Sequence, residues 1–168
     1  MLYVEDLIKI IYKQDINFFT GVPDSVLKKL SLYLDKLNKY RHVIATNEGS
    51  AVALATGYHL STKKLAAVYL QNAGLGNAIN PLISITHQKV YSIPMLLIIG
   101  WRGSPNTKKD EPQHLAQGNI TVKMLKLLNI KNCILKSNKD LKKLSNLISF
   151  SKKNNKPVAC LIENNILF

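Results

Sequence analysis

Residues able to do chemistry follow two apolar runs of this sequence. Glu48 comes shortly after the β-branched pair at 43–44, and Gly74 and Gly76 come shortly after the apolar run 65–70. In an open parallel sheet, ligands bind beyond the carboxyl ends of the strands. We therefore expect Glu48 to do chemistry at such an end, with a cofactor that this chain cannot hold alone.

The segment Gln-Asn-Ala-Gly-Leu-Gly-Asn, residues 71–77, is a glycine-rich turn that leads into a helix. Glycines at a helix N-terminus can cradle a phosphate, but they also let two backbones, or a backbone and a cofactor, pack closely. The third glycine of a dinucleotide fingerprint and the Gly-Lys-Ser/Thr ending of a P-loop are both missing. The pattern favours close packing over nucleotide binding.

Asp24 and Ser25 follow the strand-ending segment Gly-Val-Pro at 21–23. Both are residue types that cap the N-terminus of a helix, and apolar residues recur at helical spacing over 26–37. A second interpretation puts the Asp24 carboxylate beside a substrate, because this loop lies at the same sheet edge as Glu48.

The polar segment 101–118 is long for a loop, and long loops in compact domains are often functional. It contains Asp-Glu-Pro-Gln-His at 110–114, which gathers carboxylates and an imidazole. His114 is either a surface or capping histidine or a catalytic group. No second histidine stands at metal-ligand spacing, so no metal site of this chain's own is predicted.

Helices and strands must position these residues, and their patterns alternate along the chain. Predicted helices cover 3–14, 26–37, 50–60, 77–85, 121–128 and 140–151, and predicted strands cover 16–20, 42–46, 65–70, 94–100, 132–135 and 157–162. Strict alternation of this kind predicts an α/β fold: a doubly wound, six-stranded parallel sheet with helices on both faces.

Composition limits the remaining possibilities. The chain has 168 residues, which suits one domain, and a net charge of +13. Nucleic-acid binding is disfavoured, because Arg41 and Arg102 are the only arginines and no aromatic residues interleave with the lysines. No membrane span or signal peptide is predicted, and we expect a cytoplasmic protein. Cys133 and Cys160 lie in apolar runs, which favours buried free thiols over a disulfide or a metal pair.

Five ordered segments carry a resemblance to a known family. They are TGVPDS (20–25), NEGSAVALATGYHL (47–60), QNAGLGNAINPL (71–82), IIGWRG (98–103) and DEPQHLAQGNIT (110–121). Together they resemble the N-terminal, pyrimidine-binding half of the thiamine-diphosphate-dependent phosphonopyruvate decarboxylases, whose nearest relatives are the sulfopyruvate decarboxylases. The likeness covers about residues 1 to 165.

The resemblance implies roles for most of the residues above. It implies that Glu48 hydrogen-bonds N1′ of the cofactor's aminopyrimidine and favours its 4′-imino form, which requires a dry, partly apolar surround. Asp24 and His114 would handle protons or position the substrate. The resemblance also implies a pyrimidine pocket lined by Gln71, Asn72, Gly74 and Asn77.

The substrate implied is a small anionic keto acid. Ser25 and Arg102 would bind it, since a guanidinium grips a phosphonate through two hydrogen bonds; the alternative for Arg102 is a helix-end or interface salt bridge. Trp-Arg-Gly at 101–103 and the 110–114 segment favour conversion of phosphonopyruvate to phosphonoacetaldehyde and carbon dioxide. The short separate chain instead favours the sulfopyruvate decarboxylase α subunit.

One departure from the family matters. The resemblance implies that magnesium holds the diphosphate through a Gly-Asp-Gly segment followed by Asn-Asn, and the Asn-Asn pairs at 154–155 and 164–165 have no such segment before them. We therefore expect residues 1–168 to be a single pyrimidine-binding domain. Thiamine diphosphate and Mg²⁺ would be completed by a β subunit or C-terminal domain, in a homo- or hetero-oligomer that meets this chain around 49–57 and 74–76. A non-catalytic regulatory or scaffold subunit is the alternative of another class.

Overall fold

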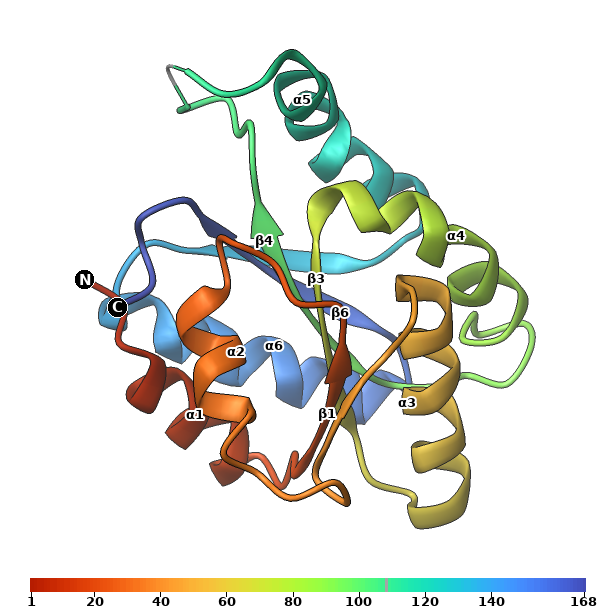
Figure 1. Cartoon of the computed structure of the whole chain (residues 1–168). Coiled ribbons are helices and arrows are strands. Elements are labelled where there is room, and N and C mark those ends of the chain that lie inside the picture. The colour runs from red at the N-terminus through yellow and green to blue at the C-terminus, as the bar shows by residue number, and fades with distance from the viewer. Residues whose placement is uncertain (108) are drawn as a thin grey trace.

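Six parallel strands form the centre of the molecule (Figure 1). The computed structural model describes residues 1–107 and 109–168. The strands are β1 (Phe18–Gly21), β2 (His42–Ile44), β3 (Ala66–Gln71), β4 (Leu96–Trp101), β5 (Lys131–Leu135) and β6 (Val158–Glu163). Their order in the sheet is β2-β1-β3-β4-β6-β5, and every neighbouring pair is parallel. The predicted parallel α/β class is confirmed.

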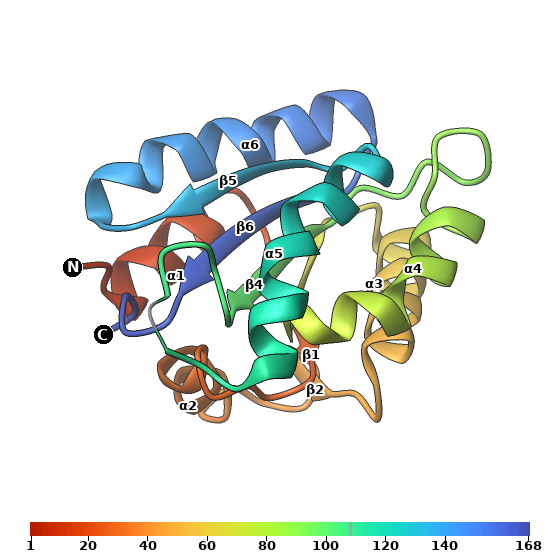
Figure 2. The same ribbon diagram turned by 90° about the horizontal axis from the view of Figure 1, so that it is seen from above.

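Helices cover both faces of this sheet. They are α1 (Val4–Lys13), α2 (Lys28–Leu34), α3 (Glu48–Thr62), α4 (Leu75–Ser84), α5 (Pro112–Leu127) and α6 (Leu141–Asn154), with 3₁₀ turns η1 (Asn72–Gly74) and η2 (Asn138–Asp140). Side chains of α1, α2 and α6 share one buried cluster, and those of α3, α4 and α5 share the other. Figures 1 and 2 show these two groups on opposite sides of the strands.

Central strand β3 explains why the two layers form. Its residues Ala66 to Leu70 are all buried, with side chains that alternate between the two clusters, as in a strand covered on both faces. Tyr69 points into the α1/α2/α6 layer and Val68 into the α3/α4/α5 layer. Because parallel strands share one direction, the carboxyl ends of β1, β3 and β4 open onto the same edge of the sheet.

Several elements begin or end two or three residues away from the predicted bounds, and α5 is much longer than predicted. Helix α2 begins at Lys28 instead of 26, because the preceding residues form a turn in which the Leu27 N–H donates to Asp24. The polar segment 101–118 was wrongly predicted to be a loop throughout: α5 begins at Pro112, with Glu111 as its extended N-cap residue. Lys108 lies in this segment but outside the described residues.

The two cysteines, distant in sequence, are neighbours in space. Cys133 on β5 and Cys160 on β6 are paired in register, and both thiols are free. The prediction of a buried free thiol is confirmed for Cys160, whereas Cys133 is only partly buried. Burial raises the pKa of the Cys133 thiol to about 11, which keeps it in the unreactive protonated form.

Within the described part of the chain, no helix combines the length and the apolar character that crossing a membrane requires.

Candidate functional site

Glu48 is the first residue of α3, and its side chain is fixed from the facing helix. Asn47 caps α3, because its Oδ1 accepts a hydrogen bond from the Ser50 N–H at 2.9 Å. The Glu48 Oε2 accepts a hydrogen bond from Asn77 Nδ2 of α4 at 2.8 Å. Glu48 is half-buried, so the dry surround expected for it is incomplete within this chain.

The Glu48 side chain packs directly against the backbone of Gly74. A Cβ atom on Gly74 would overlap the Cγ, Cδ and Oε1 atoms of Glu48, so only glycine leaves room for the side chain. Gly49 lets α3 approach α4 in the same way, since its Cβ would lie 2.9 Å from the Asn77 carbonyl oxygen. Gly76, by contrast, faces open space. The close packing predicted for the turn is therefore made at Gly74 within the chain, whereas Gly76 makes no such contact.

Asp24 lies on the other side of the 71–77 segment. Its Oδ1 accepts a hydrogen bond from Gln71 Nε2 at 2.7 Å, and its Oδ2 accepts one from the Leu27 N–H at 3.2 Å. The residue is only 9% exposed, and its carboxylate occupies the space that a side chain at position 100 would fill. Asp24 was wrongly predicted to be the N-cap residue of the helix: Leu27 is the N-cap residue of α2, and Asp24 instead stabilises the turn before it. The contact of Asp24 with a substrate stays a prediction.

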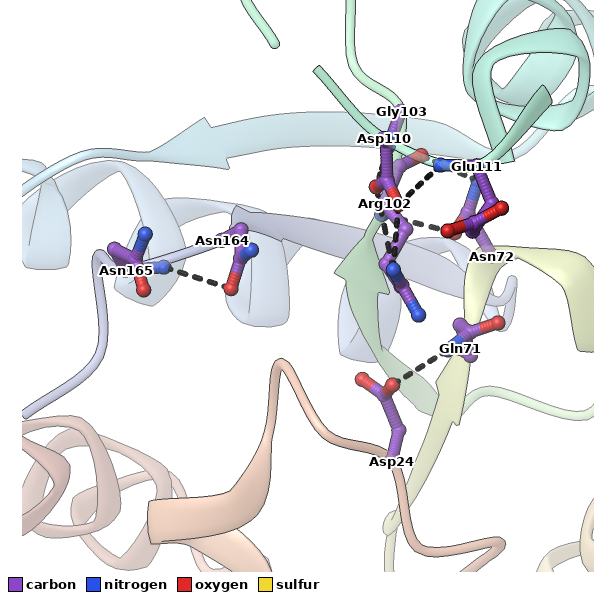
Figure 3. Close-up of polar contacts among 9 residues, drawn as sticks. All are labelled: Asp24, Gln71, Asn72, Arg102, Gly103, Asp110, Glu111, Asn164 and Asn165. Carbon is purple, nitrogen blue, oxygen red and sulfur yellow. Dashed lines mark hydrogen bonds and ion pairs between the residues drawn. The ribbon is translucent and has the colours of Figure 1, made fainter. Parts of the chain in front are cut away.

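Arg102 follows β4 and forms an ion pair within the chain. Its Nε donates to Asp110 Oδ2 at 3.3 Å and its Nη2 donates to Asp110 Oδ1 at 2.5 Å (Figure 3). The adjacent guanidinium lowers the pKa of the Asp110 carboxyl group from its ordinary value. The salt bridge predicted as the alternative for Arg102 exists, although it is internal, and contact with a substrate anion stays a prediction.

Asn72 has a structural role in this arrangement. Its Nδ2 donates to the Arg102 carbonyl oxygen and to Thr121 Oγ1, and its Oδ1 accepts from the Arg102 N–H. The side chain is 3% exposed and both amide protons are already used. Asn72 therefore ties the end of β3 to the end of β4 and to α5, and its predicted contact with a cofactor stays a prediction.

The remaining predicted residues lie around these two groups. Ser25 is exposed beside Asp24. His114 is half-buried near the start of α5, and its Nδ1 is buried with no hydrogen-bond partner among the described residues. This nitrogen is not open to solvent, and the catalytic role of His114 stays a prediction.

Two side-chain groups thus meet the same sheet edge. The first is Glu48 with Gly74 and Asn77, on the α3/α4 side; the second, shown in Figure 3, includes Asp24, Gln71, Asn72 and Arg102. The 71–77 segment belongs to both and holds them together.

Sequence reasoning missed the partners that fix these residues. Asp110 was visible only as one carboxylate of the 110–114 segment, and Thr121 gave no signal. The two Asn-Asn pairs, expected to be ordinary polar turns, differ. Asn154 is the last residue of α6 and Asn155 its C-cap residue, whereas Asn164 and Asn165 form a turn in which the Asn165 N–H donates to Asn164 Oδ1 at 3.1 Å (Figure 3). Among residues 1–107 and 109–168, no cluster of three His, Cys, Asp or Glu side chains could hold a metal ion.

Comparison with protein families gives one match. Residues 1–140 match the model described as thiamine pyrophosphate enzyme, N-terminal TPP binding domain. Glu48, Asp24, Arg102 and His114 all lie within the matched region.

Two curated relatives and one solved structure are similar to the chain. The sulfopyruvate decarboxylase subunit alpha of Methanococcus maripaludis is 35% identical over 75% of this chain and 72% of its own length. The phosphonopyruvate decarboxylase of Streptomyces viridochromogenes is 37% identical over 77% of this chain but only 32% of its own length. The thiamine diphosphate-dependent 4-hydroxybenzoylformate decarboxylase of Rhodococcus jostii RHA1 has the same fold, with a TM-score of 0.72 at 22% identity over 95% of this chain and 29% of that chain.

Proposed function

Because the chain belongs to the thiamine pyrophosphate enzymes, as an N-terminal TPP binding domain, we propose that it supplies the pyrimidine-binding half of a keto-acid decarboxylase. Its relatives are decarboxylases of phosphonopyruvate and sulfopyruvate. The chain spans about a third of the phosphonopyruvate enzymes but most of the sulfopyruvate α subunits, and we infer that a second polypeptide or domain supplies the diphosphate-binding part.

The observation that carries this proposal is how the Glu48 side chain is held. Its Oε2 is held by Asn77, and no described residue donates a hydrogen bond to its Oε1. Because Gly74 has no side chain, the Glu48 carboxylate has room at the sheet edge. A ring nitrogen placed there would find one fixed carboxyl oxygen still free to share a proton, which is what an aminopyrimidine requires.

Thiamine diphosphate, when bound, supplies an electron sink for the loss of carbon dioxide. The chain's own residues hold the reacting groups in place and move protons. Glu48 holds a proton at Oε1 and exchanges it with the pyrimidine nitrogen. Asp24 and His114 stand where they can move protons to or from the substrate, with Gln71 fixing the Asp24 carboxylate. Mg²⁺ would be held by the partner, which brings the diphosphate site.

The α3/α4 surface is where we place this partner. Residues 49–62 and 65–88 contain no Asp, Glu, Lys or Arg, in a chain of net charge +13. Large apolar side chains are nevertheless exposed there: Leu54 is 40% exposed, Leu60 49% and Ile83 49%. An uncharged, partly apolar surface next to Glu48 fits a protein partner that would also bury the half-exposed carboxylate.

The experiment reconstitutes the complex. The chain is co-expressed with a polypeptide that contains Gly-Asp-Gly followed by Asn-Asn, and the purified complex is assayed with thiamine diphosphate and Mg²⁺ on phosphonopyruvate, sulfopyruvate and pyruvate. We expect one of the first two to be decarboxylated fastest. Glu48→Gln should abolish this activity, whereas Glu5→Gln, an exposed carboxylate of α1, should not change it.

Other outcomes would support another function. A complex that forms but decarboxylates none of these acids would contradict the proposal. Full activity in the Glu48→Gln complex would show instead that this chain is a non-catalytic regulatory or scaffold subunit.

A further inference from the structure

Arg102 lies just beyond the end of β4, near the face of that strand against which Asp24 packs. Leu96 and Ile98 point into the α1/α2/α6 layer, and Gly100, two residues later, faces the Asp24 carboxylate. Arg102 is the first residue after β4, two residues beyond Gly100. In Figure 3 the free end of its side chain points toward the Asp24–Gln71 pair.

Both the backbone and the guanidinium group of Arg102 are fixed by hydrogen bonds. Its backbone N–H and C=O are hydrogen-bonded to the Asn72 side chain. Its guanidinium is held by Asp110, whose carboxylate also accepts hydrogen bonds from the N–H groups of Gly103 at 3.2 Å and Glu111 at 2.9 Å. The side chain of Asp110 is only 5% exposed, whereas that of Arg102 is 26% exposed. The acid is thus the buried member of the pair, and the base reaches the surface.

The donors of the guanidinium divide into two sets. An arginine carries five N–H donors in a rigid plane. Asp110 binds the edge formed by Nε and Nη2. The end formed by Nη1 and Nη2 keeps its outward N–H groups, and none of the described residues accepts a hydrogen bond from Nη1. This end is a preformed fork for two oxygens of one anion.

We propose that Asp110 is a positioning residue that aims this fork of Arg102 at a tetrahedral oxyanion, the phosphonate or sulfonate group of the substrate. The inference rests on the proposed function, and it names the part of the substrate that this chain selects. Asp110 binds the neighbouring edge of the guanidinium, which shares only Nη2 with the fork, so it orients the arginine and leaves the outward N–H groups of Nη1 and Nη2 for the anion. A carboxylate also fits such a fork with its two oxygens. A phosphonate or sulfonate group has a third oxygen that stays free for a further donor when two are bound by Arg102, and a carboxylate does not.

The test uses the complex with its diphosphate-binding partner. Calorimetry measures the dissociation constants of phosphonoacetate, sulfoacetate and malonate, which differ in whether a tetrahedral oxyanion or a second carboxylate is present. Asp110→Asn keeps the size of the side chain and loses its charge. We expect the preferred tetrahedral anion to bind about tenfold more weakly or worse, with malonate affected less.

Comparing KM with kcat distinguishes a loss of Arg102 positioning from a general loss of folded protein. In Asp110→Asn, KM for the preferred keto acid should rise about tenfold while kcat changes far less, as expected when ground-state and transition-state binding are lost equally. Arg102→Lys should show the same loss, because an ammonium group cannot make the fork, and Asp110 there still holds Gly103 and Glu111. Arg102→Lys decides the question if Asp110→Asn does not fold.

The matched control is Asp15→Asn. Asp15 pairs with Lys64 at 3.3 Å on the exposed surface, so the variant removes the same charge away from the site. Its dissociation constants should equal those of the unmodified chain. Unchanged preference for the tetrahedral anion in Arg102→Lys, or equal weakening of all three ligands, would overturn the inference. A complex that binds these anions with the expected preference but decarboxylates nothing would overturn the proposed function alone.

Discussion

The Glu48 carboxylate lies against the α-carbon of Gly74, so the first residue of α3 and the turn after β3 share one contact surface. We expect Gly74→Ala to displace Glu48 and to lower kcat/KM of the complex about a hundredfold, which corresponds to about 2.7 kcal/mol. Steady-state kinetics of the purified variant complex measure this. Gly76→Ala is the folding control and is measured on this chain alone: its Cβ meets no atom within 4 Å, so the free energy of unfolding should rise by about 0.4–1 kcal/mol.

Asn72 should contribute more to stability than a surface polar residue does. Asn72→Ala removes its hydrogen bonds to Arg102 and Thr121 in a buried setting and leaves the Arg102 backbone groups unpaired. We expect the free energy of unfolding to fall by about 2–3 kcal/mol in denaturant titrations. Thr121→Val removes only the contact with Thr121 and that residue's bond to Gln117, so its loss should be smaller, about 1 kcal/mol. Equal losses in the two variants would contradict the role given to Asn72.

The stability of the fold should depend on pH through His42. Its Nε2 lies 2.8 Å from the Tyr69 hydroxyl, and burial lowers the pKa of the imidazole below its ordinary value of 6.5, although Asp35 opposes this effect. The unfolded chain therefore takes up a proton at higher pH than the folded chain does. The free energy of unfolding should fall as the pH drops below about 6.5, and this part of the slope should disappear in His42→Gln. Denaturant titrations at several pH values check it; an identical slope in the variant would contradict the prediction.

The uncharged α3/α4 surface should be required for association with the partner. Leu54 lines an open apolar groove there with Phe18 and Tyr58, whose rings stack with centroids 4.6 Å apart. Leu54→Glu should weaken complex formation about a hundredfold or more in co-purification and titration experiments, because it buries an unpaired charge. Leu32→Glu on α2 is the control: Leu32 is 52% exposed and lies on the opposite layer, so the complex should form normally.

Periodicity and apolar runs were enough to predict the parallel sheet, because β1, β3, β4 and β6 are buried along almost their whole length. The position of Glu48 near the carboxyl end of a strand, at the start of a small-residue helix, was predictable, and its role in a site stays a prediction. The long-range contacts were not: nothing in the sequence tells that Asn72 meets Thr121, or that Asp110 holds Arg102. The start of α5 at Pro112 was missed because its polar residues show no apolar stripe, although proline in the first turn of a helix is a recognised signal.

The position of β6 between β4 and β5 has a consequence for biosynthesis. Strand β5 cannot join the sheet until β6 has been translated, so β4 keeps one hydrogen-bonding edge open while about sixty further residues, to the end of β6 at Glu163, emerge from the ribosome. That edge belongs to an apolar strand with six buried residues in the finished fold. A nascent chain stalled before Val158 would expose a ready template for aggregation.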